Sequence, residues 1–128
     1  MGVEALALAL LVGQTETLGV EVRLSAPGRS WSGRGRVERR ADDAVLEAEL
    51  RGGARGSATV SFRRASRWLR VFAVEPGQRS LRRSGQADTP STLYVGAGRV
   101  WVLSLQDVRV TVRFDRGRDE PGPRDGQR

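Results

Sequence analysis

The chain has 128 residues, of which 38% are hydrophobic and 29% charged, and its formal net charge is +7 at pH 7. This length suits one domain with its own hydrophobic core, and the composition excludes a wholly disordered chain. The sequence contains no cysteine and no histidine, which excludes disulfides, thiol catalysis and the most common metal ligands.

The first 14 residues contain an unbroken apolar run at residues 5–12. Eight residues are too few to cross a bilayer, which takes about 20 residues as a helix. Glu4 stands where a signal peptide would carry positive charge. We therefore expect residues 1–14 to form a short helix or a first strand, with a membrane-targeting segment as the alternative.

From residue 17 onward, apolar residues recur at every second position, the pattern of strands with one buried face. Val20, Val22 and Leu24 share one side of the first such segment, and Glu21 and Arg23 share the other. The same alternation at residues 46–50 and 58–62 predicts two further amphipathic strands.

Residues 68–74 are apolar at almost every position except Arg70. A run of this kind is typical of a central strand covered on both faces. It is followed by Glu75-Pro76-Gly77-Gln78, in which proline and glycine occupy the second and third positions of a type II turn.

Residues 99–105 and 108–114 are separated only by Gln106-Asp107, which predicts a two-residue hairpin. In that register Leu105 faces Val108, Leu103 faces Val110 and Trp101 faces Val112 on one side of the sheet. We therefore expect Trp101 to be a core residue.

Turn-forming residues gather at 26–30, 51–56 and 96–98, and residues 84–91 are only weakly patterned. Residues 116–128 contain no apolar side chain other than proline and are expected to form a flexible polar tail. The sequence thus predicts a single all-β domain over residues 15–115. Its expected architecture is an antiparallel β-sandwich or small β-barrel of about seven to eight strands.

No catalytic or metal-binding residue is expected. The acidic cluster Asp42, Asp43, Glu47 and Glu49 matches no calcium-loop spacing, and Glu47 and Glu49 belong to the solvent side of a strand. No nucleophile stands beside a base, and the glycines fit no phosphate-binding loop. We expect no cofactor and no small-molecule substrate, and the sequence does not indicate a compartment.

The most informative feature is residues 51–86, which contain nine arginines and one acid, Glu75. Guanidinium groups bind phosphates and carboxylates through two hydrogen bonds and stack on aromatic rings. Lysine, isoleucine and asparagine are absent, a bias typical of a G+C-rich genome, so arginine alone does not establish recognition. The candidate contact residues are Arg63, Arg64, Arg67, Trp68, Arg70, Arg79, Arg82 and Arg83.

Two functions remain open. The favoured hypothesis is a non-enzymatic binding or assembly module whose cationic surface contacts a protein partner or a further copy of the chain. The alternative is a single-stranded nucleic-acid-binding protein that uses the strip at residues 63–83, an arrangement that suits an oligonucleotide-binding barrel. Arginine on outward strand positions also protects a sheet from aggregation, which is the structural explanation of the same pattern.

Overall fold

The structure is a computed structural model that describes residues 15–53, 55–89 and 93–115. The described residues form eight strands and no helix, which confirms the expected all-β class. In chain order the strands are β1 (Glu16–Ala26), β2 (Arg29–Arg40), β3 (Asp43–Gly52), β4 (Gly56–Arg63), β5 (Trp68–Val74), β6 (Leu81–Gln86), β7 (Val100–Leu105) and β8 (Val108–Phe114).

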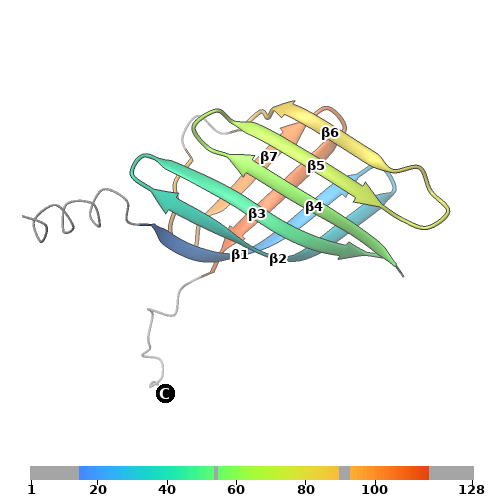
Figure 1. The fold of residues 1–128 in the computed structure, drawn as a ribbon, viewed down its shortest axis with the longest axis horizontal. Coiled ribbons are helices and arrows are strands. Elements are labelled where there is room, and N and C mark those ends of the chain that lie inside the picture. The colour runs from blue at the N-terminus through green and yellow to red at the C-terminus, as the bar shows by residue number, and fades with distance from the viewer. Residues whose placement is uncertain (1–14, 54, 90–92, 116–128) are drawn as a thin grey trace, which may run out of the picture.

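All eight strands belong to one antiparallel sheet with the order β6-β5-β4-β3-β2-β1-β8-β7. The sheet curls until its two edges approach, so that β7 and β8 cross behind β4 and β5 (Figure 1). Asp88, just after β6, joins Ser104 of β7 through two backbone hydrogen bonds of 2.7 and 3.0 Å. The result is a nearly closed up-and-down barrel, whereas an oligonucleotide-binding barrel is a five-stranded Greek key.

The barrel interior is filled by the inward-facing side chains of all eight strands. At its centre the Trp101 ring makes edge-to-face contacts with Phe62 and Phe114, at centroid distances of 5.6 and 5.0 Å. The indole Nε1 of Trp101 donates a 2.8 Å hydrogen bond to the carbonyl oxygen of Tyr94. Aromatic pairs of this geometry stabilise a core beyond the area they bury.

The expected hairpin register is confirmed, because Trp101 pairs with Val112, Leu103 with Val110 and Leu105 with Val108. Only 1% of the Trp101 surface is exposed, as expected of a core residue. The predicted type II turn is also present. Gly77 has a φ of 80°, and the amide of Gln78 donates a 3.0 Å hydrogen bond to the carbonyl of Glu75.

The prediction that residues 68–74 are covered on both faces is wrong. Leu69, Val71 and Ala73 are fully buried in the barrel, but Trp68 is 45% exposed and Arg70 is exposed. The physical reason is that a barrel has one inner and one outer side, and no described element packs over the outside of β5. The outward half of this strand is therefore free to form a contact surface.

Sequence patterning also missed β2 and β6. Strand β2 has glycine at two inward positions, Gly33 and Gly35, so its apolar alternation is interrupted. An added Cβ at Gly35 would lie 2.5 Å from the Cβ of Ala48 and 2.6 Å from the carbonyl oxygen of Glu47. Strand β6 has a single buried apolar residue, Leu81. Neither segment carries the period-two signal on which the prediction depended.

The predictions for residues 1–14 and 116–128 lie outside the described residues. In the part of the chain that the structure describes, no helix is long and apolar enough to cross a membrane.

The close approach of β2 and β3 makes a stability prediction. Gly35→Ala forces its new methyl group against backbone atoms, so we expect a loss of roughly 1–3 kcal/mol in the free energy of unfolding. Urea denaturation followed by far-UV circular dichroism measures it. Gly96→Ala is the matched control, because a Cβ there meets nothing within 4 Å; its change should stay below about 0.5 kcal/mol. Equal stability of the two variants would contradict the packing argument.

Candidate functional site

The outward positions of β4, β5 and β6 form a continuous surface, which we call the cationic face. Because side chains alternate along a strand, every second residue of these three strands points away from the barrel interior. Leaving out Ser57 and Val74 at one end of the β4–β5 pair, the cationic face consists of Thr59, Ser61, Arg63, Trp68, Arg70, Phe72, Arg82, Ser84 and Gln86.

The strand register places the three arginines of this face on a diagonal. Arg63 lies on β4 opposite Trp68, Arg70 lies on β5 opposite Ser61 and Ser84, and Arg82 lies on β6 opposite Phe72. With strands about 4.8 Å apart and a rise of about 3.4 Å per residue, successive arginines have their Cα atoms about 8 Å apart. The arginines therefore cross the face as an oblique line rather than along one strand.

The cationic face carries three positive charges and no acidic residue. Arg70 has no ion pair or hydrogen bond from its side chain to any described residue. Arg63 lies 3.5 Å from the carboxylate of Asp43, with 60% of its side chain exposed, so this contact is weak. The guanidinium of Arg82 lies 4.9 Å from the ring centroid of Phe72. These charges remain available to a partner.

Trp68 and Phe72 are the two aromatic residues of the face. They lie four residues apart on β5, about 13 Å along the strand, with Arg70 between them. Trp68 is the exposed member of the three tryptophans, since Trp31 and Trp101 are 2% and 1% exposed. Trp68 therefore presents an aromatic ring on the outside of the barrel, in the middle strand of the three.

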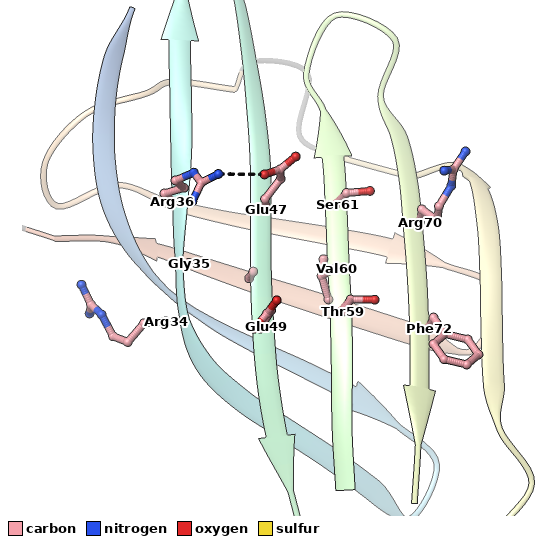
Figure 2. Close-up of a pocket in the computed structure, with 11 residues that line it drawn as sticks. Arg34, Gly35, Arg36, Glu47, Glu49, Thr59, Val60, Ser61, Arg70 and Phe72 are labelled. Atoms are coloured by element: carbon pink, nitrogen blue, oxygen red, sulfur yellow. Dashed lines mark hydrogen bonds and ion pairs between the residues drawn. The ribbon is translucent and has the colours of Figure 1, made fainter.

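A shallow groove of about 680 Å³ crosses the outside of β2, β3, β4 and β5. Its floor is the backbone at Gly35, Ala48 and Val60, between two rows of outward side chains. Figure 2 shows Arg70 and Phe72 at the β5 end of this groove, across β4 from Glu47 and Glu49 of β3. The two glutamates therefore form an acidic border to the cationic face.

The structure brings together four of the eight residues expected from the sequence: Arg63, Trp68, Arg70 and Arg82. The other four lie elsewhere. Arg64 donates hydrogen bonds to the carbonyl oxygens of Leu93 (3.1 Å) and Asp42 (2.8 Å) and so holds loops at one end of the barrel.

Arg67 and Arg79 lie in the connections at opposite ends of β5. Arg67 adopts a φ of 59°, and its carbonyl accepts a 2.8 Å hydrogen bond from the amide of Ala87. The carbonyl of Arg79 accepts a 3.3 Å hydrogen bond from the guanidinium of Arg29. Neither residue occupies an outward strand position, so the expected strip at residues 63–83 is not one patch.

Arg83 faces the seam between β6 and β7. Its Nε and Nη2 atoms donate to the two carboxylate oxygens of Asp107 at 2.8 and 3.0 Å. The hydrogen bond from Arg83 lowers the pKa of Asp107, and the same bond raises the pKa of Arg83. This pair links β6 to the β7–β8 turn, so Arg83 has a structural role in holding the barrel closed.

Sequence reasoning missed Phe72 and the polar residues around it, Thr59, Ser61, Ser84 and Gln86. A signal for Phe72 was present. Arg70 shows which side chains of β5 point outward, and Phe72, two residues later, points to the same side. Because the strand was expected to be buried on both faces, Phe72 was not recognised as an outward residue.

Two residues of the acidic cluster are held in contacts with their neighbours. Asp43 accepts hydrogen bonds from the amides of Ala44 (2.7 Å) and Ala65 (2.9 Å), and Glu47 pairs with Arg36 at 3.2 Å. In the described part of the chain, no three acidic side chains converge on a point where a metal ion could bind.

No protein-family model matches the chain, and no curated protein or solved structure is significantly similar to it.

The Arg83–Asp107 pair predicts a pH-dependent stability. Because the folded-state pKa of Asp107 is lowered, its contribution is present above the unfolded pKa and is lost as the pH falls through the folded pKa. Asp107→Asn should therefore lower the thermal midpoint at neutral pH, by a small amount since the pair is exposed. The difference should narrow as the pH is lowered through the acidic range. A difference that is constant with pH, or equal to that of Glu49→Gln, would show that the pair does not stabilise the seam.

Proposed function

We propose that this protein is a non-enzymatic binding module whose contact surface is the cationic face, and that its partner is an extended anionic chain. One observation carries the proposal. Three neighbouring strands present three arginines and no acid on their outward positions, together with the exposed ring of Trp68.

The contrast with the rest of the barrel supports this choice. On the outside of β1, β2 and β8, Arg34 pairs with Asp115, Arg36 with Glu47 at 3.2 Å, and Arg113 lies 3.9 Å from Glu21. These three arginines each have an acidic neighbour, although Arg23 and Arg109 on the same strands form no ion pair with a described residue. On the cationic face no acid stands among the arginines, and a local field of one sign attracts an oppositely charged partner and speeds its association.

The sequence alone ranks a protein partner or assembly first. An apolar assembly interface would need a continuous exposed apolar patch. Among the described residues, the large exposed hydrophobic side chains apart from Trp68 are Tyr94, Val100 and Val102, and the Tyr94 ring lies 4.6 Å from the Arg99 guanidinium. We therefore place an anionic partner ahead of an apolar one.

Binding to a generic polyanion tests the proposal. Arg63, Arg70 and Arg82 changed together to alanine should weaken the binding of labelled heparin about tenfold or more at low salt, because three charge contacts are lost. Fluorescence anisotropy measures the affinity. The matched control changes Arg23, Arg109 and Arg113 to alanine, which removes the same charge from the outside of β1 and β8. Equal losses in the two triple variants would mean that net charge alone binds heparin and that the cationic face has no special role.

Removing a negative charge from the acidic border should strengthen heparin binding instead of weakening it. Glu49 forms no ion pair with a described residue and stands opposite Thr59 at the edge of the cationic face. By the strand spacing, Glu49 lies about 12 Å from the arginine diagonal, where a charge in water is worth about 0.3 kcal/mol, so Glu49→Gln should tighten heparin binding by up to about twofold at low salt. Glu21→Gln, two strands further from the cationic face, should have a smaller effect. A loss of affinity in Glu49→Gln would contradict the assignment of the surface.

A further inference from the structure

We infer that the anionic chain recognised by the cationic face is a single-stranded nucleic acid, with its phosphates along the arginine diagonal and its bases on Trp68 and Phe72. This inference rests on the proposed function, since it names the partner of the same surface. It depends on the order in which cations and aromatic rings alternate across β4, β5 and β6.

The register makes each aromatic ring the neighbour of two arginines. Trp68 lies beside Arg63 across the β4–β5 pair and two residues from Arg70 along β5. Phe72 lies two residues from Arg70 and beside Arg82 across the β5–β6 pair. The path from Arg63 to Arg82 therefore meets cation, ring, cation, ring and cation in turn. A chain that alternates negative phosphates with flat bases has the same repeating character.

The rings are placed to stack on bases. Trp68 is 45% exposed, and no described aromatic ring or guanidinium stacks on its indole. The guanidinium of Arg82 covers one side of Phe72 at 4.9 Å, and such a pair offers a flat cationic surface on which a base also stacks. Sequence-tolerant binding to single strands uses stacking of this kind together with a basic track for the backbone.

Other anionic partners make poorer use of this surface. An acidic peptide would pair with the arginines but gain little from two separated rings. A double helix keeps its base faces stacked inside, where Trp68 and Phe72 cannot reach them. Only a partner with exposed planar groups would contact both the arginines and the rings. The hydroxyl groups of Ser61 and Ser84, on either side of Arg70, add hydrogen-bonding capacity between the rings.

The acidic border at β3 limits the site on one side, and the arginine diagonal limits its length. Glu49, which forms no ion pair with a described residue, repels a phosphate chain that would continue over β3, so we expect the nucleic-acid strand to lie on β4, β5 and β6. The diagonal from Arg63 to Arg82 spans about 17 Å between Cα atoms. At the stacked spacing of 3.4 Å this length holds at most about five nucleotides. We expect a minimal site of about four to five nucleotides, at the lower end of single-strand sites on barrel folds.

The test compares a labelled ten-residue deoxythymidine oligonucleotide with heparin and polyglutamate, using the full chain and anisotropy at several salt concentrations. We expect the oligonucleotide to bind most tightly, with a slope of log affinity against log salt near −2, about 0.7 for each of three phosphates. Trp68→Ala should weaken oligonucleotide binding roughly 5- to 150-fold and leave heparin binding unchanged. Trp68→Phe, which keeps a ring, should restore most of the loss.

Two controls separate stacking from loss of structure. Tyr94→Ala removes another exposed ring, outside the cationic face, and should leave oligonucleotide binding unchanged. Fluorescence of the buried Trp31 and Trp101 reports whether the Trp68→Ala variant is folded, and in the unmodified protein the oligonucleotide should quench the emission of Trp68.

The outcomes distinguish the two proposals. If all three polyanions bind equally well and Trp68→Ala changes none of them, the partner is not a nucleic acid and the proposed function stands alone. Tighter binding of polyglutamate than of the oligonucleotide would indicate an acidic protein segment and overturn this inference. If none of the polyanions binds, both the inference and the proposed function are wrong.

Discussion

The packing of Trp101 inside the barrel is the contact on which the other features depend. Its ring joins β7 to Phe62 on β4 and to Phe114 on β8, and its indole nitrogen is bonded to the carbonyl of Tyr94. A side chain that contacts both halves of one curled sheet fixes how far the sheet closes. Because the sheet closes around its own interior, no second layer of the described chain covers the outward residues of β4, β5 and β6.

Closure also requires that the strands approach closely, and glycine makes this possible in β2. With no side chain at Gly35, the backbone of β2 lies against Ala48 and Glu47 of β3 at distances that exclude a Cβ atom. The groove on the outside of the barrel crosses the same position, and Glu47 and Glu49 of β3 lie along it. The pairing of β3 with β2 and β4 therefore places these acids beside the cationic face.

Much of this fold could be predicted because its strands obey simple alternation. The register of the β7–β8 hairpin followed from the two-residue connection and the positions of Leu103 and Val110. The β2 and β6 strands could not be predicted, since glycine and arginine replace apolar residues at their inward positions. In these two strands the local sequence does not show which residues are buried, because the burial is caused by neighbouring strands that are far away in the sequence.

The candidate site shows the same division between local and distant information. That Arg70 faces outward is local, whereas the alignment of Arg63, Arg70 and Arg82 on a diagonal depends on the pairing of three strands. The number of arginines in this stretch of the sequence therefore suggested a larger contact surface than the fold forms, because Arg64 and Arg83 are held in structural contacts. What distinguishes a contact arginine from a structural one is whether the fold has already given it an acceptor. In the cationic face, the arginine at the centre of the diagonal has none among the described residues, and its charge is consequently available to a partner.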